Sequence, residues 1–167
     1  MIEIRKAEIK DAAEAARIFQ SARLFMRSHG NMIQWNNGYP SIEDVYSDVE
    51  NGCGYVICED GRVFAYFAFI LGEDPTYAYI EGEWPDPSPY GTIHRIAGDG
   101  TQNGVLKNCV EFCRTICPHI RIDTHEDNHA MRNALAKMGF VHCGTIYIAD
   151  GTPRMAFCLS DKATKMP

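Results

Sequence analysis

The segment from Tyr55 to Leu71 constrains the fold more than any other part of the chain. An Asp60-Gly61 pair separates two runs rich in aromatic and β-branched residues, which predicts a two-residue β-hairpin turn. The second run, Arg62–Leu71, is apolar at successive positions and does not alternate. A strand of this kind is buried on both faces, so it belongs in the middle of a sheet that other elements cover.

The patterns on either side of this hairpin define the fold class. Further strands are expected at Ile2–Ala7, Tyr90–Ala97, Ile120–Thr124, Val141–Ile148 and Pro153–Leu159. Helices are expected from Asp11 (a capping box with Glu14), from Ser41 (an N-cap), at Val105–Cys117 and at Asn128–Met138, the last ended by Gly139. Three successive strands followed by strand–helix units indicate an α/β (α+β) fold, with a mixed central sheet of about seven strands flanked by four helices.

Composition narrows the class of protein. A length of 167 residues favours a single domain over residues 1–167. A net charge of −6 without a basic block argues against nucleic-acid binding. No apolar run is long enough to span a membrane, and Met1–Lys6 carries no apolar leader. The seven cysteines, an odd number without a CxxC pair, are expected to be free thiols in a reducing cytoplasm.

A glycine-rich turn between an expected strand and an expected helix carries the first chemical signal. Gly98, Gly100 and Gly104 lead directly into the helix at Val105. The N–H groups of a helix N-terminus and its positive dipole end together favour a phosphate or pyrophosphate. No Gly-Lys-Ser/Thr follows, so the turn is not a P-loop, and the three preceding strands argue against a Rossmann fingerprint.

A second motif begins at Asn128. The run Asn128-x-x-Met131-x-x-Ala134-Leu135-x-Lys137-x-Gly139-Phe140 resembles the Asn-x-x-Ala-x-x-Leu-Tyr-x-Lys-x-Gly-Phe segment of the GNAT superfamily of N-acetyltransferases. The order of elements is similar to that family along nearly the whole chain. The glycine turn falls where the family binds the pyrophosphate of coenzyme A.

The resemblance implies a donor site for acetyl-CoA and no metal. Its expected cofactor-binding residues are Ile96, Ala97, Gly98, Gln102, Asn103, Gly104, Val105, Leu106 and Asn128. Thr101 and Leu106 depart from the family's Arg/Gln-x-x-Gly-x-Gly/Ala turn. Leu135 stands where many members carry a Tyr, and because it cannot donate a proton, another group or a water must protonate the departing thiolate.

The resemblance also implies direct attack of a primary amine, of a small molecule or amino acid, on the thioester. The attacking amine must be neutral, so a base is needed. His94 is the first candidate because an unperturbed histidine titrates in the useful range, and Tyr90 and Glu81 are alternatives. Two irregular aromatic segments are expected to bind the acceptor, through Gln34, Trp35, Tyr39, Glu81 and Trp84.

Two other functions stay open at this stage. A metal-binding module would use His125, His129, His142 and Cys143, of which the first two are spaced for one helix face. A catalytically weak acyl-CoA-binding protein on the same fold would explain Leu106 and Leu135. The sequence leaves the oligomeric state open, with a homodimer among the alternatives.

Overall fold

The hairpin predicted at Asp60-Gly61 is present in the computed structural model of the chain, which describes residues 1–164. It joins β2 (Gly54–Glu59) to β3 (Arg62–Leu71) in an antiparallel pair. Asp60 and Gly61 have φ values of 49° and 81°. Two successive left-handed residues are what a type I′ turn requires, and this turn matches the twist of the paired strands.

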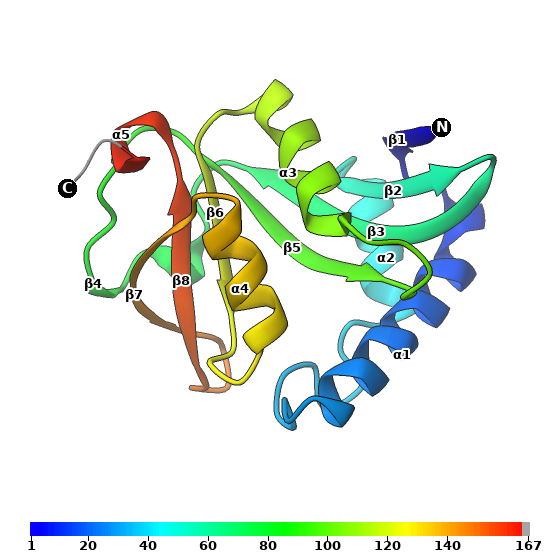
Figure 1. Cartoon of the computed structure of the whole chain (residues 1–167), viewed down its shortest axis with the longest axis horizontal. Coiled ribbons are helices and arrows are strands. Elements are labelled where there is room, and N and C mark those ends of the chain that lie inside the picture. The colour runs from blue at the N-terminus through cyan, green and yellow to red at the C-terminus, as the bar shows by residue number, and fades with distance from the viewer. Residues whose placement is uncertain (165–167) are drawn as a thin grey trace. The chain divides into compact units, whose positions relative to one another are not determined.

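The remaining elements confirm the predicted fold class (Figure 1). The other strands are β1 (Ile2–Lys6), β4 (Glu81–Gly82), β5 (Gly91–Gly98), β6 (Ile120–Thr124), β7 (Val141–Tyr147) and β8 (Pro153–Leu159). The helices are α1 (Ala12–Ser28), α2 (Ile42–Glu50), α3 (Val105–Ile116), α4 (His129–Lys137) and the short α5 (Asp161–Thr164), with 3-10 helices η1 (Ile9–Asp11) and η2 (Pro75–Tyr77). The eight strands form one mixed sheet in the order β1-β2-β3-β5-β6-β8-β7-β4.

Strand β4 is the element that the sequence did not reveal, and it raises the count from about seven strands to eight. Glu81 and Gly82 pair with Thr145 and Gly144 of β7. The two backbones approach so closely that a Cβ at Gly82 would lie 2.3 Å from the Cys143 carbonyl oxygen. Two residues are too few to show an alternating pattern, which is why this segment was predicted to be irregular.

The predicted capping box of Asp11 with Glu14 is wrong. The Asp11 carboxylate accepts hydrogen bonds from the Arg5 guanidinium at 2.8 and 3.0 Å and from the Glu8 N–H at 2.8 Å. The hydrogen bond from Arg5 lowers the pKa of Asp11, against the opposing effect of burial. The Asp11 carboxylate therefore links η1 to β1 through hydrogen bonds, and it does not cap α1. The predicted Ser41 cap is confirmed, since Ser41 Oγ accepts from the Asp44 N–H.

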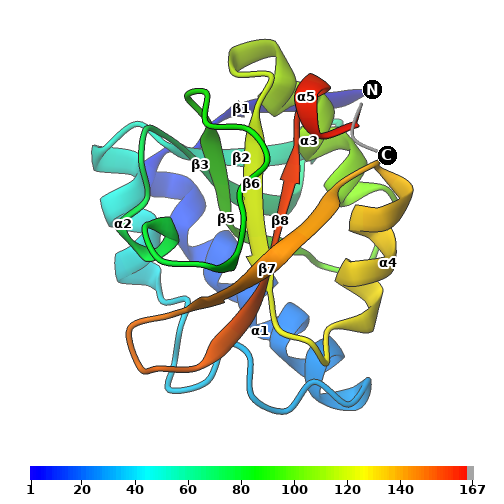
Figure 2. The ribbon, with the colours of Figure 1, turned by 90° about the vertical axis from the view of Figure 1, so that its left-hand side faces the viewer.

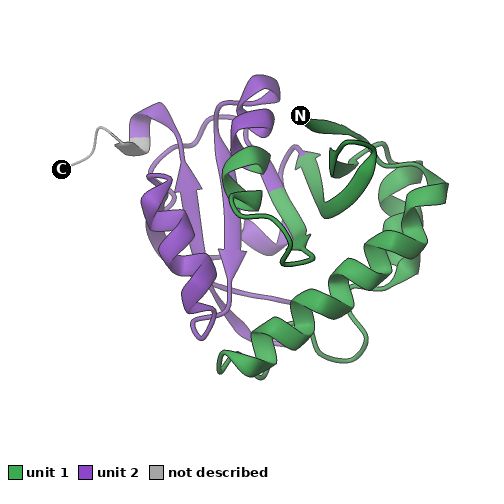
Figure 3. Cartoon of the chain, turned by 45° about the vertical axis from the view of Figure 1, so that its right-hand side comes forward, with its two compact units in different colours: residues 1–70, 93–109 green, residues 71–92, 110–167 purple. Residues whose placement is uncertain are grey.

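The chain divides into two compact units, which Figure 3 colours separately. Unit 1 comprises residues 1–70 and 93–109, and unit 2 comprises residues 71–92 with the residues from 110 onward. Neither unit is a continuous stretch, because β5 and α3 both cross the boundary. The expectation of a single domain over 1–167 stays a prediction, and residues 165–167 lie outside the described part of the chain.

Unit 1 has its core between two helices and the sheet. Ala15, Ile18 and Phe19 of α1 and Val45 of α2 pack against side chains of β2, β3 and β5. The partners on the strands are Val56, Cys58, Tyr66 and Ala97. Val56 and Cys58 are two residues apart, so they lie on one face of β2, and the two helices cover that face.

Unit 2 is built around antiparallel strands. Strand β8 pairs with β6 on one side and with β7 on the other (Figure 1), and Figure 2 shows β8 running beside β6. A small aromatic cluster, Tyr77 and Tyr90 with Ile146 and Ala156, is buried in this unit. Gly139 ends α4 with a φ of 90°, as the sequence predicted. Among residues 1–164, no helix combines the length and apolarity needed to cross a bilayer.

Candidate active site

The end of β5 and the start of α3 meet in unit 1. A Cβ placed on Gly98 would lie 2.9 Å from Val105 Cγ2, so the strand end and the first residue of the helix are in close contact. The first helical hydrogen bond runs from the Asn108 N–H to the Gly104 carbonyl oxygen at 3.0 Å. The N–H groups of Val105 and Leu106 precede that bond, and they therefore have no acceptor inside the helix.

The turn between these elements is open on its outer side. Gly100 and Gly104 have φ values of 85° and 76°, and a Cβ on either would meet no heavy atom within 4 Å. Left-handed glycines expose backbone that a side chain would otherwise cover. The turn therefore fits a pyrophosphate: its backbone is accessible, and it ends at the positive end of the 12-residue helix α3.

The one acidic side chain of this turn is held by partners. Asp99 Oδ1 accepts hydrogen bonds from the Thr101 N–H at 2.9 Å and from Thr101 Oγ1 at 2.6 Å. Arg62 forms an ion pair with Asp99 and donates to Thr101 Oγ1 at 3.1 Å. Burial favours the neutral acid, but the bonds from Thr101 and Arg62 outweigh it and lower the pKa of Asp99. Arg62 thus compensates the Asp99 charge beside the proposed phosphate position.

Leu106, which departs from the family turn, is only 8% exposed. Its side chain is buried and does not cover the outer surface of the turn. Gln102 is half-buried and donates to the Glu59 carboxylate, while Asn103 is exposed. The predicted donor residues of the turn therefore lie together in unit 1, and Asn103 and Gly104 are the exposed ones.

Strand β5 carries an unusual backbone residue between the predicted base and the predicted donor segment. Arg95 has a φ of 54°, and it lies between the half-buried His94 and Ile96. Arg95 Nη2 and Nε donate to the two carboxylate oxygens of Asp48 at 2.6 and 3.0 Å. A left-handed non-glycine residue costs about 1–3 kcal/mol and persists only where its surroundings hold it.

Asp48 comes from α2, and no motif or periodic pattern marks it as a site residue. It also accepts a hydrogen bond from the Tyr66 hydroxyl at 2.6 Å, and Arg95 Nη1 donates to the Tyr39 hydroxyl at 3.1 Å. Burial, reinforced by the Asp48 carboxylate, raises the pKa of Tyr66 above its usual range. Asp48, Arg95 and Tyr66 are here called the Asp48 cluster.

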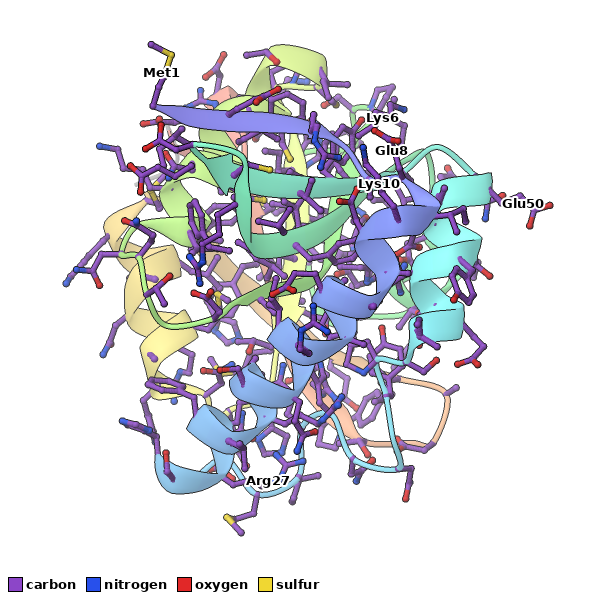
Figure 4. All side chains as sticks on the ribbon, turned by 90° about the vertical axis from the view of Figure 1, so that its right-hand side faces the viewer. Met1, Lys6, Glu8, Lys10, Arg27 and Glu50 are labelled. Carbon is purple, nitrogen blue, oxygen red and sulfur yellow. The ribbon has the colours of Figure 1, made fainter. Side chains whose placement is uncertain are left out.

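The predicted acceptor residues of unit 1 lie in the loop after α1. Arg27, at the C-terminal end of α1 (Figure 4), donates to the Gln34 and Trp35 carbonyl oxygens at 2.7 and 3.1 Å. Gln34 is buried and accepts from the Asn31 amide at 3.0 Å. Trp35 is 7% exposed and packs edge-on against Phe19, whereas Tyr39 is 40% exposed. Tyr39 is therefore the accessible member of this group.

The other predicted residues lie in unit 2. The Arg121 guanidinium lies over the rings of both Tyr90 and Trp84, with its central carbon 3.9 and 4.0 Å from the ring centroids. The Tyr90 hydroxyl accepts from the Asp74 N–H at 2.8 Å, and Trp84 donates to the Tyr77 carbonyl oxygen. Glu81 is exposed on β4 and accepts from the Tyr147 hydroxyl at 2.9 Å.

Asn128 is the N-cap of α4 in unit 2, and Leu135 lies within that helix. Asn128 Oδ1 caps the helix by accepting from the Met131 N–H at 3.2 Å, so its amide has a structural partner in addition to its predicted cofactor role. Leu135 is fully buried. In chain position, the predicted donor turn, His94 and three acceptor residues fall in unit 1, and Tyr90, Glu81, Trp84 and Asn128 fall in unit 2.

Three of the residues predicted for a metal-binding module, His125, His142 and Cys143, contact other protein groups. His125 Nδ1 accepts from the Asp127 N–H at 3.1 Å, and a ring nitrogen of His142 lies 3.1 Å from the Gly144 carbonyl oxygen. The Cys143 thiol lies 3.5 Å from Cys158 Sγ. Within residues 1–164, no three His, Cys, Asp or Glu side chains form a group that could hold a metal ion.

Known proteins that are similar to this chain identify its family. The sequence matches no model of a protein family, and it matches no curated protein. Among solved structures, a GNAT-family acetyltransferase from Streptococcus agalactiae is 31% identical, with a TM-score of 0.85 over 96% of this chain and 95% of that one. A GNAT-family acetyltransferase from Listeria monocytogenes shares 16% identity, with a TM-score of 0.68 over 94% and 93% of the two chains.

A third similar structure, from Salmonella typhimurium, is of a protein assigned as an acetyltransferase and solved with its cofactor acetyl-CoA. It is 15% identical, with a TM-score of 0.60 over 95% of this chain and 93% of that one. The likeness to the Listeria and Salmonella structures shows the fold alone. The Streptococcus relative shares sequence as well: this chain belongs to the GNAT family of acetyltransferases.

Proposed function

We propose that this enzyme transfers an acetyl group from acetyl-CoA to a primary amine of a small molecule or amino acid. The observation that carries the proposal is the Gly98–Leu106 segment, where tight packing of β5 on α3 leaves an open, left-handed turn at the helix N-terminus. The acetyl-CoA in the Salmonella relative supports the same donor here. When bound, acetyl-CoA supplies an acyl group already activated as a thioester.

Each part of the chain has a distinct task in this proposal. Backbone N–H groups from Gln102 to Leu106 bind the pyrophosphate, and the backbone of Ile96, Ala97 and Gly98 pairs with the pantetheine arm. An N–H group of that strand polarises the thioester carbonyl, as an oxyanion hole does. His94 accepts the amine proton, directly or through water, with Tyr90 and Glu81 as alternatives. Holding the two reactants together supplies much of the acceleration.

The acceptor is proposed to contact Tyr39, with Gln34, Trp35, Glu81 and Trp84 as further candidates. The exposed Glu81 carboxylate suits a cationic amine. Leu135 is buried and cannot protonate the leaving thiolate, so another group or a water takes that role. A reducing cytoplasm suits the seven cysteines, all of which are free thiols.

Two substitutions at Gly104 test the donor site. Gly104→Asp and Gly104→Asn are nearly isosteric, and both side chains tolerate the left-handed backbone better than other residues do. Only the Asp variant adds negative charge where a phosphate is expected. Isothermal titration calorimetry should show acetyl-CoA binding weakened by about 1–2 kcal/mol, roughly 5- to 30-fold, more in the Asp variant than in the Asn variant. Equal affinities would show that no phosphate binds at this turn.

A screen for thiol release tests the reaction itself. The parent enzyme is incubated with acetyl-CoA and a panel of amino acids, diamines and aromatic amines, and free thiol is measured. Turnover of at least one amine is expected. Acetyl-CoA binding without thiol release from any of the amines would favour the acyl-CoA-binding alternative, for which the buried Leu135 is the supporting observation.

A further inference from the structure

The backbone of Arg95 is exceptional among the described residues. Four non-glycine residues there have positive φ: Trp35 and Asn37 in a loop, Asp60 in a hairpin turn, and Arg95 within a strand. A left-handed residue interrupts the regular extended path of a strand and redirects the peptide groups on either side of it. In β5 those groups belong to His94 and Ile96, at the start of the proposed pantetheine segment.

The Arg95 side chain is fastened at both ends of its guanidinium. Asp48 binds Nε and Nη2 as a bidentate acceptor, and the Tyr39 hydroxyl accepts from Nη1. The Asp48 and Arg95 side chains are 5% and 13% exposed, so water screens the ion pair little. A bidentate pair of this kind fixes orientation as well as distance.

Asp48 is itself held in place. The Tyr66 hydroxyl donates to it, and β2 begins at Gly54 directly against both residues. A Cβ on Gly54 would lie 2.7 Å from the Tyr66 hydroxyl and 3.1 Å from Asp48 Cβ. Gly54 therefore packs closely against the Asp48 cluster, and the Asp48 carboxylate is held by hydrogen bonds from Tyr66 and from the Arg95 guanidinium.

We propose that Asp48 and Arg95 are positioning residues for acetyl transfer: their ion pair holds β5 in its left-handed bend, so that the backbone after residue 95 is set to pair with the pantetheine arm. This inference rests on the proposed function. The guanidinium acts on the strand and does not touch the donor.

A matched pair of variants separates the effect of the left-handed backbone at residue 95 from the effect of the Arg95 side chain. Glycine adopts positive φ without the steric cost that alanine pays. Because removing Arg95 alone would leave a buried carboxylate unpaired, both variants carry Asp48→Asn: one adds Arg95→Gly and the other Arg95→Ala. Circular dichroism melts first establish that each double variant folds, and Asp48→Asn with Arg95 intact is the control.

The readout compares two ligands by calorimetry: acetyl-CoA, and phosphoadenosine diphosphate, which is the nucleotide half of coenzyme A. A variant with a displaced strand should lose affinity for acetyl-CoA only, because the nucleotide binds at the turn. We expect the Ala variant to bind acetyl-CoA about tenfold more weakly, and the Gly variant to stay within about threefold of the parent. Both should bind the nucleotide half as the parent does.

The alternative outcomes are distinct. If the Gly and Ala variants lose acetyl-CoA affinity equally, the guanidinium contacts the donor directly and the positioning role is wrong. If neither variant changes the ratio of the two affinities, β5 does not depend on Arg95. A parent enzyme that binds neither ligand would instead overturn the proposed function itself.

Discussion

At the scale of single residues, Trp35 and Tyr39 differ in burial, although they lie in the same loop. Both were predicted to bind the acceptor because aromatic loop residues are often binding residues. In the structure, Trp35 is 7% exposed, and it belongs to the core of unit 1 with Phe19. Tyr39 is 40% exposed, and its ring packs edge-on against Trp35. Trp35 is therefore a core residue of unit 1, and its role in binding the acceptor stays a prediction.

We expect Trp35→Ala to lower the free energy of unfolding by about 3–5 kcal/mol, because it leaves a cavity under α1. Urea denaturation followed by circular dichroism measures this. Tyr39→Phe is the matched control: it keeps the ring and removes only the hydroxyl that accepts from Arg95, which should cost about 1 kcal/mol or less. A Trp35→Ala protein as stable as the parent would contradict the packing assignment.

At the scale of elements, local signals in the sequence were the reliable ones. The Asp60-Gly61 hairpin, the Ser41 cap and the Gly139 helix end were predicted correctly, because each depends on residues within four positions of one another. Asp11 was assigned to the wrong partner, because its carboxylate binds Arg5 of the preceding strand in place of the helix N-terminus. Strand β4 was missed because its two residues are too few to show a periodic pattern, and its partner strand β7 lies more than sixty positions away.

The junction of β5 and α3 gives a prediction about two elements together. Gly98→Ala would place its new methyl group 2.9 Å from Val105 Cγ2 and force the helix start away from the strand. We expect a loss of about 1–3 kcal/mol in unfolding free energy. Val105→Ala removes the clashing methyl group, so the double variant should be more stable than the sum of the single losses indicates. Additive losses in this double-mutant cycle would show that the clash relaxes elsewhere.

At the scale of the whole molecule, the site was only partly predictable. The glycine turn and the Asn128 motif are continuous in the sequence, and the family resemblance that they suggested is confirmed. The Asp48–Arg95 pair joins residues 47 positions apart, and no periodic pattern marks either residue. Which residues form a buried ion pair depends on how the whole chain folds, and no local pattern in a single sequence marks them.

The stability of the molecule in acid should depend on Asp86, which is 3% exposed. Burial favours its neutral form, but hydrogen bonds from Ser88 and Ser160 and the nearby His119 outweigh that effect and lower the pKa of Asp86 to about 2. An unfolded Asp has a pKa of about 3.9, so the folded state gains about 2 kcal/mol from Asp86 above about pH 4. This contribution is lost as the pH falls toward 2.

Asp86→Asn should therefore be less stable than the parent by about 2 kcal/mol at pH 7, with a difference that shrinks below about pH 4. Urea denaturation at pH 7, 5 and 3 measures the difference. Asn keeps an oxygen that can accept from the Ser88 N–H, so the variant tests the charge and retains that bond. If the difference in unfolding free energy is the same at all three pH values, the loss comes from packing and not from the charge of Asp86.

The interleaving of the two units has a consequence for synthesis on the ribosome. Residues 71–92 of unit 2 emerge before residues 93–109, which complete unit 1. Until β5 has emerged, the apolar strand β3 has a neighbour, β2, on one side only. Unpaired strand edges of this kind recruit other chains. A chain that ends before residue 93 lacks β5, so one edge of its most apolar strand, β3, is expected to stay unpaired and open to other chains.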